Sequence, residues 1–406
     1  MSTPQGPALP RRLGTVDAVV IGLGSMIGAG IFVALPSAAA AAGSGLLAGL
    51  AVAAVVAYCN ATSSARLAAR YPQSGGTYVY GRERLGPFWG HTAGWSFIVG
   101  KTASCAAMAL TVGHYVWPQW AHGIAVATVV ALTALNYAGI RKSAAATRII
   151  VAVVLAVLAA VVVTVLGFGG PQAERLAPGG DVGGVLQAAG LLFFAFAGYA
   201  RIATLGEEVR DPERTIPRAI TIALVITLLV YAVVAVAVLA ELGSDTLASA
   251  TAPLADAVVA AGCPAVAPVV RAGAAVAAVG ALLALILGVS RTTLAMARDG
   301  YLPRTLATVH PRFGSPHRAE VAVGIVVAVV AAVVDVRAAI GFSSFAVLLY
   351  YAIANASAAT LGRRLIPAVG LVGCLVLAFT LPLSSVLAGL AVVAVGAVVY
   401  GVRRVS

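Results

Sequence analysis

An apolar segment near the N-terminus contains the run Gly22-Leu23-Gly24-Ser25-Met26-Ile27-Gly28-Ala29-Gly30-Ile31-Phe32. Glycine costs about 1 kcal/mol per residue in a helix relative to alanine, and alanine is plentiful in this chain. The clustered glycines therefore indicate a backbone that needs freedom or close approach to a neighbour. A second apolar segment has a related feature, Gly190-Leu191-Leu192-Phe193-Phe194-Ala195-Phe196-Ala197-Gly198-Tyr199.

The rest of the chain surrounds these two segments with further apolar blocks. Of its 406 residues, 61% are hydrophobic and 10% charged, whereas a soluble domain carries roughly 25% charged residues. The blocks are long enough to cross a bilayer, which takes about 20 residues per helix, and none alternates like a barrel strand. The sequence therefore predicts an all-α membrane protein of about twelve spans. These spans are expected at residues 14–41, 44–69, 88–115, 121–139, 148–168, 185–206, 216–240, 266–290, 319–335, 338–361, 366–381 and 384–402.

The net charge of +12 is distributed along the chain in a way that records membrane topology. Basic residues gather in alternate loops, whereas residues 243–268 contain no lysine or arginine. Such asymmetry is typical of the positive-inside rule, and it argues against nucleic acid as a partner. It predicts a multi-pass protein with both termini cytoplasmic, and the Ala-, Val- and Gly-rich composition favours a bacterial plasma (inner) membrane.

The two glycine-containing segments are the first and sixth expected spans. Because five spans separate their starts, spans one to five and six to ten would have opposite orientations in the membrane. Interrupted helices at matching positions of two inverted halves indicate a transporter's binding site. We therefore expect four parts along the chain: a cytoplasmic N-terminal tail (1–13), a first repeat (14–169), a second repeat (185–362) and a peripheral pair of spans (365–402).

The glycine run of the first span has competing interpretations. A dinucleotide fingerprint fails on spacing and has no flanking strand. A packing seam over Gly24-x-x-x-Gly28 would let one neighbouring helix approach closely. Alternatively, the helix unwinds at the middle of the membrane. Its freed amides and a half-helix N-terminus would then hold a carboxylate, and freed carbonyls of both breaks would hold an ammonium. An amino acid carries both groups.

Four motifs give the chain a resemblance to the amino acid–polyamine–organocation (APC) transporters, the amino acid permeases. The run Gly24 to Phe32 resembles the first-span signature of that family. Three further segments are similar to family motifs that follow one another in the same order. They are the sixth span with the loop after it, the loop after span eight, and the segment after span two. The last three are Phe193 to Tyr199 with Glu207 to Ile220, Ser290 to Pro303, and Tyr71 to Tyr78.

This resemblance implies a leucine-transporter-type 5+5 inverted repeat with two additional C-terminal helices, and amino acid transport by proton coupling or exchange. It places the substrate carboxylate against Ser25 and the amides of Gly28 to Gly30. The ammonium would lie against carbonyls near Ile27, Phe194, Ala195 and Ala197, with Phe196 facing the solute. The full set of substrate-binding residues implied is Ser25, Met26, Ile27, Gly28, Ala29, Gly30, Phe194, Ala195, Phe196, Ala197 and Gly198.

The chain departs from the family pattern after Gly198. Many relatives carry an acidic residue there, where this chain has Tyr199-Ala200-Arg201. Because no aspartate or glutamate lies near the middle of an expected span, dicationic substrates are disfavoured and neutral or small amino acids are favoured. Tyr199 and Arg201 are candidates for gating, although an ion pair at the helix end would also explain Arg201. Ser290 with Thr292 and Thr293 would line a cation position, or would be ordinary helix-end hydroxyls.

Lys101 is the one ionisable residue expected deep inside a span. It lies 14 residues past Pro87, about 21 Å along a helix at 1.5 Å per residue. Intramembrane charges are costly and usually functional, and a lysine removed from water loses its proton more readily. Lys101 could therefore couple transport to protons. The alternative is a lysine that reaches an aqueous vestibule or pairs with backbone carbonyls.

Other functional classes lack their chemistry in this sequence. An enzyme would need paired intramembrane carboxylates, a metal motif or a nucleophile with its base, and we expect none of these, no metal and no cofactor. A sensor or scaffold would usually bring a soluble output domain, and the loops are short. We therefore expect a secondary transporter whose partners are an amino acid, a proton or exchanged amino acid, and the bilayer. The alternatives are a transporter of another small amine or nucleobase-like solute, and a sensor without transport.

Overall fold

The computed structural model describes residues 13–71, 75–139, 144–203, 209–310 and 315–405. The expected N-terminal tail lies, apart from Leu13, outside the described residues, as do Glu207 and Glu208. Within the described residues the chain is helical, and its one β-type pairing is an isolated bridge between Leu13 and Val209.

The helices follow the apolar blocks of the sequence. In chain order, the longer helices are α1 (Thr15–Met26), α2 (Gly30–Ala42), α3 (Leu46–Arg70), α4 (Thr77–Leu85), α5 (Pro87–Val116), α6 (Ala121–Tyr137), α7 (Ala144–Phe168), α8 (Val182–Phe196), α10 (Pro212–Ser249), α11 (Pro253–Ala260), α12 (Ala267–Arg298), α13 (His317–Val333), α14 (Val336–Ala359), α15 (Leu365–Thr380) and α16 (Leu383–Val405). The short elements are η1 (Gly43–Gly45), η2 (Pro118–Trp120), η3 (Ala173–Leu176), η4 (Ala197–Tyr199), α9 (Ala200–Ala203), η5 (Pro264–Val266) and η6 (Arg304–Ala307).

Nine helices of the described part are long and apolar enough to cross a bilayer. This number treats residues 30–70, which contain α2, η1 and α3, as one helix. Expected spans nine and eleven correspond to α13, with 17 residues, and α15, with 16 residues. Each expected span therefore coincides with one helix or, for the first and sixth spans, with an interrupted helix. Nine helices of the described residues are long enough to cross a bilayer.

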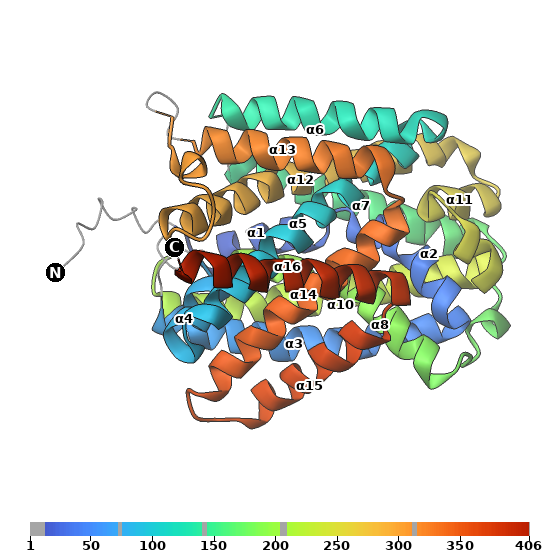
Figure 1. Cartoon of the computed structure of the whole chain (residues 1–406). Helices are drawn as coiled ribbons and strands as arrows, with labels where there is room; N and C mark the ends of the chain where they lie inside the picture. The colour runs from blue at the N-terminus through green and yellow to red at the C-terminus, as the bar shows by residue number, and fades with distance from the viewer. Residues whose placement is uncertain (1–12, 72–74, 140–143, 204–208, 311–314, 406) are drawn as a thin grey trace.

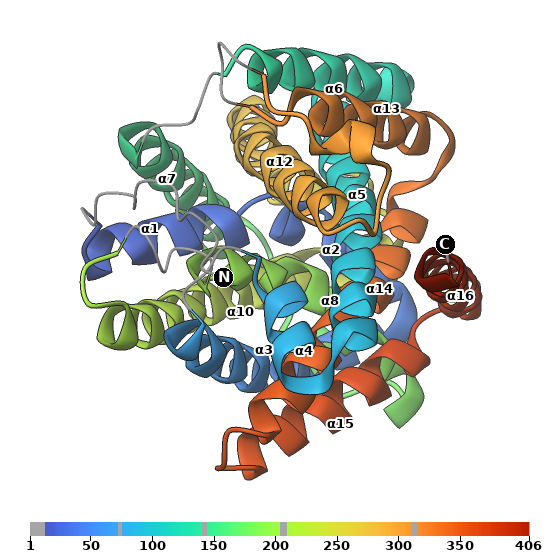
Figure 2. The same cartoon turned by 60° about the vertical axis from the view of Figure 1, so that its left-hand side comes forward.

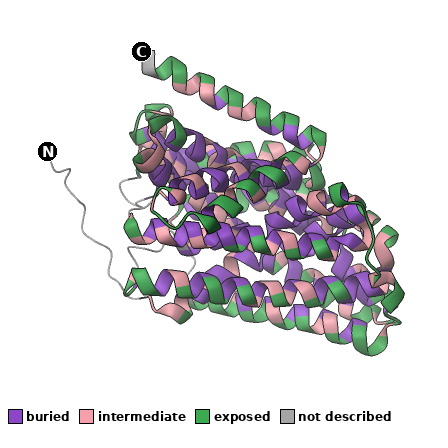
Figure 3. Ribbon diagram, turned by 90° about the horizontal axis from the view of Figure 1, so that it is seen from below, coloured by how far each residue is buried: buried purple, intermediate pink, exposed green. Residues whose placement is uncertain are grey.

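The centre of the bundle consists of the first and sixth expected spans. Helix α2 packs against α8, α8 packs against α3, and α5 packs against both α12 and α14. Figures 1 and 2 show α6 beside α13 at one edge of the molecule and α16 along the outside. Burial agrees with this arrangement, because the buried residues face the middle of the bundle while α16 is mostly exposed or half-buried (Figure 3).

Two short helices lie in segments that the sequence analysis assigned to loops. Helix α4 precedes α5 and packs against it and against α14, and α11 connects α10 to α12. Helix α10 begins at Pro212, four residues earlier than the expected start at residue 216, with Pro217 inside its first turns. A proline at the first helical position is tolerated because its missing N–H would have no helical partner there. Of α4, α10 and α11, only α4 lines the cavity that is described in the next section.

Candidate functional site

The first expected span is interrupted in its middle. Helix α1 ends at Met26, Ile27 adopts φ −80° and ψ 55°, and α2 begins at Gly30. We call residues 25–30, which comprise this interruption and the helix ends on either side of it, break one. Among the described residues, the amides of Gly28, Ala29, Gly30 and Ile31 have no backbone acceptor outside their own helix, as at other helix N-termini, whereas Phe32 N–H donates to Ala29 O over 3.0 Å. Break one therefore gathers unpaired donors at the positive end of α2.

The sixth expected span is disturbed less strongly. Helix α8 ends at Phe196, the 3-10 turn η4 occupies Ala197–Tyr199, and α9 continues directly from Ala200. We call residues 195–199, which comprise η4 and the end of α8, break two. Backbone angles remain near helical at Phe196 and Ala200, so the turn tightens the helix without unwinding it.

The two breaks touch through their backbones. A Cβ atom on Gly198 would collide with the carbonyl oxygen of Ser25 and would lie 2.7 Å from the amide nitrogen of Met26. A Cβ atom on Gly30 would lie 2.6 Å from Cα of Ala195. Real Cβ atoms essentially never approach this closely. These glycines therefore allow break one and break two to cross.

The glycines of the first span do not form a seam with one partner. A Cβ on Gly24 would meet Thr147 and Val151 of α7 at 3.1 Å, whereas a Cβ on Gly28 would meet Ala281 of α12 at 2.8 Å. Because Gly24 and Gly28 face different helices, the interpretation of a single packing seam is wrong. The first span is interrupted, and its glycines also allow close packing against both α7 and α12.

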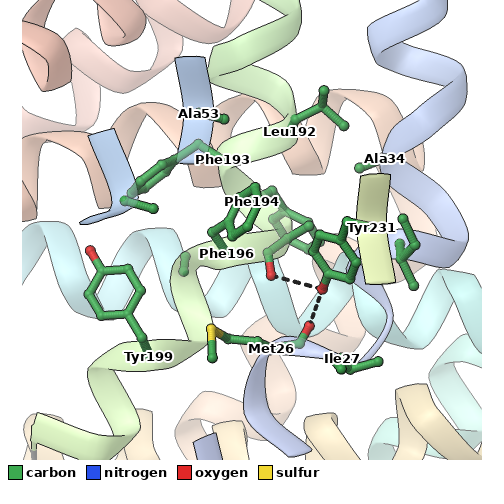
Figure 4. Close-up of a cluster of buried hydrophobic side chains, with 14 of the residues drawn as sticks. Met26, Ile27, Ala34, Ala53, Leu192, Phe193, Phe194, Phe196, Tyr199 and Tyr231 are labelled. Atoms are coloured by element: carbon green, nitrogen blue, oxygen red, sulfur yellow. Dashed lines mark hydrogen bonds between the residues drawn. The ribbon is translucent and has the colours of Figure 1, made fainter. Parts of the chain in front are cut away.

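A tyrosine of α10 joins the two breaks. The hydroxyl of Tyr231 lies 2.5 Å from the carbonyl oxygen of Met26 and 3.2 Å from that of Ala195, as the dashed lines in Figure 4 show. Its single proton serves both acceptors. The sequence analysis missed Tyr231, although a hydroxyl in the middle of an otherwise apolar span was a usable signal.

Beside this crossing lies a cavity of about 230 Å³. Liquid water occupies about 30 Å³ per molecule, so the space suits a small solute and not a peptide. Its wall includes most of the predicted binding residues, together with parts of α4, α5, α12 and α14. The predicted residues that line it are Ser25, Met26, Gly28, Ala29, Gly30, Phe194, Ala195, Ala197, Gly198, Lys101 and Arg201.

Four predicted residues lie outside this wall. Phe196 is fully buried and packs against the ring of Tyr231, with centroids 5.3 Å apart, so the ring that lines the cavity is Phe194. Ile27 is buried in the core. The ring of Tyr199 packs against that of Tyr351 in a tilted arrangement, with centroids 5.0 Å apart. Ser290 is fully buried and donates to Ile286 O of its own helix, as an ordinary helix hydroxyl does. Of the hydroxyls named with it, Thr292 lines the cavity and Thr293 does not, and the cation position stays a prediction.

Lys101 lies in the cavity wall and is only 6% exposed. Its ammonium donates to the carbonyl oxygen of Ala197 over 3.2 Å. Ala197 is the C-cap of α8, and the C-terminal end of a helix attracts positive charge. Both observations agree with the alternative interpretation of this lysine, in which it reaches a cavity or pairs with backbone carbonyls. Its role in proton coupling stays a prediction.

Polar residues support break two from behind. The hydroxyl of Tyr351 also points at Ala197 O, at the longer distance of 3.4 Å. Farther from the cavity, Asn355 of α14 donates to Asn60 of α3 over 2.6 Å, and both side chains are fully buried. Neither the asparagine pair nor Tyr351 was predicted, because each lies in a span whose pattern reads as plain apolar helix.

Helix α4 and the two glycines before it line one end of the cavity. Gly75, Gly76 and Tyr78 line it, and the amide of Thr77 donates to the hydroxyl of Tyr350 over 3.1 Å. The hydroxyl of Tyr78 donates to Asp299. Arg201 and Arg291 line the same cavity, and both make interactions of their own. The segments at this end carry the basic loops of the sequence, which the positive-inside rule predicts to be cytoplasmic.

The geometry defines a class: a multi-pass helical membrane protein with a small hollow at the crossing of two interrupted helices. Residues 17–400 match the amino acid permease family. The chain therefore belongs to the amino acid permeases, within the APC transporters. Membership confirms the family expected from the sequence and its assignment as a transporter and not an enzyme, and it implies the leucine-transporter-type fold.

The relatives with similar sequences are transporters. An uncharacterized transporter of Mycobacterium tuberculosis is 73% identical over 405 residues, covering 98% of this chain and 92% of the relative. The branched-chain amino acid permease BcaP of Bacillus subtilis is 29% identical (76% of this chain, 72% of the relative). The methylthioribose transporter of Bacillus subtilis is also 29% identical (81% and 76%). Human cationic amino acid transporter 4 is 28% identical (85% and 58%). Because these names cover different solutes, the comparisons establish a transporter and not its substrate.

Proposed function

We propose that this chain is a secondary active transporter of small amino acids in the plasma (inner) membrane, driven by proton coupling or by exchange. The observation that carries the proposal is the cavity beside the crossing of break one and break two. Unpaired backbone groups at such breaks are the usual way in which transporters hold charged solutes near the middle of the bilayer.

The carboxylate of the amino acid would bind at break one. The amides of Gly28 to Gly30 lie at the N-terminus of α2, a helix of 13 residues, and all three residues line the cavity. Amides and a positive helix end together favour an anion. The hydroxyl of Ser25 already donates to Ile21 O over 2.9 Å, so the backbone and not this hydroxyl would supply the donors.

The ammonium would bind at the carbonyls of the same crossing. Met26 O and Ala195 O converge on one point, the Tyr231 hydroxyl, and each oxygen keeps a second lone pair. Phe194 and Ala197 line the adjoining wall. Carboxylate and ammonium would then lie about one carbon apart, as they do in an α-amino acid.

The membrane arrangement follows from the family and the charge pattern. We propose twelve spans in total. Residues 14–169 and 185–362 form the two inverted repeats, residues 365–402 form the peripheral pair, and both termini are cytoplasmic. With this orientation the cavity extends toward the cytoplasm, because α4 and the arginine-bearing ends of α9 and α12 line it. At the other side, the Tyr115 hydroxyl donates to Phe32 O over 2.8 Å and ties α5 to α2.

The substrate's side chain is proposed to be small and not cationic. In the described part of the wall the charged side chains are Lys101, Arg201 and Arg291, and no carboxylate lines the cavity. A cationic side chain would therefore be repelled and would find no counter-ion. This agrees with the expectation from the sequence, which disfavoured dicationic substrates because no carboxylate was expected near the middle of a span. Lys101 is proposed as the proton-coupling residue.

The test is a competition panel in proteoliposomes, with and without an imposed pH gradient. We expect small amino acids to be taken up and L-arginine to compete poorly. Uptake that rises with an inward proton gradient would establish symport, and uptake that needs amino acid inside would establish exchange. A protein that binds and moves no amino acid, but does move a nucleobase or methylthioribose, would contradict the proposal.

A further inference from the structure

Lys101 brings a positive charge into the cavity wall with little to balance it. The structure gives its ammonium one acceptor, Ala197 O, although the group has three hydrogen atoms to donate. No aspartate or glutamate within reach of an ion pair is present among the described residues. A buried charge with only a carbonyl beside it is costly and is retained where it has a task.

On the side of the cavity that α5 lines, Lys101 is the one charged side chain among the described residues. Phe97 and Met108 of α5 line the wall on either side of it. Ser104 also lines the wall, but its hydroxyl is used, with Ser343 Oγ at 2.6 Å and Gly100 O at 3.2 Å. A solute group that extends toward α5 would therefore meet apolar side chains and one ammonium.

The α-carboxylate has its own donors elsewhere. Break one offers the amides of Gly28 and Ala29, which have no backbone acceptor among the described residues. Those amides belong to the α1–α2 connection, whereas Lys101 belongs to α5 and contacts break two. Two separate sets of anion-binding groups thus face one small cavity. Arg201 and Arg291 add to its positive potential, which concentrates anions.

We propose that Lys101 binds a second carboxylate of the substrate, so that the preferred solutes are small acidic amino acids such as aspartate or glutamate. This proposal rests on the proposed function and refines it. The expected small size is kept, and a neutral side chain is replaced by an acidic one. The carboxylate would take up the unused donors of Lys101 and supply the missing counter-charge.

The experiment compares solutes that are alike in shape and differ in one charge. Purified full-length protein is titrated with L-aspartate against L-asparagine, and with L-glutamate against L-glutamine, with L-leucine and L-arginine as further members. Binding is measured by calorimetry, and exchange is measured as counterflow in proteoliposomes. We expect the wild type to bind each acid on the order of tenfold more tightly than its amide, because one charged hydrogen bond is worth about that factor.

The variant Lys101→Gln should lose this preference. Its acid-to-amide affinity ratio should fall to about one or below, since the charged donor is gone, while asparagine binding reports that the variant is folded. Lys101→Arg keeps the charge and should keep a preference for acids. Arg318→Gln removes the same charge from an exposed position of α13, away from the cavity, and should leave the ratio unchanged.

Two results would overturn the inference while leaving amino acid transport intact. One is a wild type that binds the amides or leucine at least as well as the acids. The other is a Lys101→Gln variant that weakens acids and amides equally, which would place the α-carboxylate common to all of them at Lys101. If no member of the panel binds or exchanges, the proposed function fails together with the inference.

Discussion

Break one and break two lie against each other, yet they depart from helical geometry to different degrees. Break one separates two helices, with Ile27 at ψ 55° and a new N-terminus at Gly30. Break two contains a single 3-10 turn between α8 and α9. Break one exposes amide donors that have no acceptor in the described part of the chain, whereas break two presents carbonyls that already accept hydrogen bonds.

This difference teaches how one site obtains both polarities. A helix that stops and restarts exposes the amides of its second half, so break one needs no side chain to attract an anion. The acceptors of break two are shared with Tyr231, Lys101 and Tyr351. Side chains that accompany a carbonyl can be removed by mutation, whereas backbone amides cannot. Mutations should therefore affect break two through its partners and break one through its packing.

The largest effect is expected where the two breaks touch. Gly198→Ala places a methyl group against the Ser25 carbonyl and the Met26 amide, and overpacking of this kind costs typically about 1–3 kcal/mol. The crossing must shift, so we expect a lower melting temperature in detergent and at least about a tenfold loss of uptake rate, since 1.4 kcal/mol corresponds to tenfold.

The matched control for Gly198→Ala is Gly167→Ala. Gly167 lies in α7, and a Cβ there would meet nothing within 4 Å. Alanine is the better helix former, so this variant should match the wild type in uptake and equal or exceed it in melting temperature. A Gly198→Ala protein that behaves like Gly167→Ala would show that the crossing is not needed.

The sequence predicted the main architecture because its signals are local. Apolar blocks locate the helices, and the glycines of residues 22–30 mark an interruption that the structure places between Met26 and Gly30. Both signals depend on a residue's own preference for helix or lipid. The family resemblance added which segments meet, and the close approach of Gly198 to Ser25 agrees with it.

The details that escaped prediction depend on helix rotation and on distant partners. The resemblance implied that Phe196 faces the solute, but the 3-10 turn after residue 196 and the packing of Phe196 on Tyr231 leave Phe194 as the ring that lines the cavity. Tyr231 itself lies 205 residues from its acceptor Met26. Helix α4 was missed because it is short and polar, and its place under the cavity depends on tertiary contacts with Tyr350 and Asp299.

The second prediction concerns Lys101, whose ammonium donates to Ala197 O in break two. Lys101→Met removes an ammonium in the middle of α5 that can exchange protons, so we expect uptake to respond less steeply to pH than in the wild type. The measurement is initial uptake of L-asparagine over a pH series. A neutral solute is used so that lost binding of an acidic side chain does not contribute. A pH response identical to that of the wild type would remove Lys101 from coupling.

The third prediction compares two tyrosines. Tyr231→Phe removes the hydroxyl shared by Met26 O and Ala195 O, and should weaken substrate binding by about fivefold, because one neutral hydrogen bond contributes about 1 kcal/mol. Tyr351→Phe removes a longer bond, 3.4 Å, that reaches break two alone, and should weaken binding less. Equal or reversed effects would mean that the link between the breaks carries no weight in binding.

The smallest effect is expected at break one itself. Ser25 lines the cavity, but its hydroxyl donates back to Ile21 O over 2.9 Å, so it offers an acceptor and not a donor to a carboxylate. Ser25→Ala should therefore change substrate affinity by less than about twofold, well below the factor expected for loss of a charged hydrogen bond. Calorimetric titration of the variant and the wild type with the same amino acid makes the comparison. A loss of tenfold or more would show that the hydroxyl turns to the substrate, and that a side chain contributes to carboxylate binding at break one.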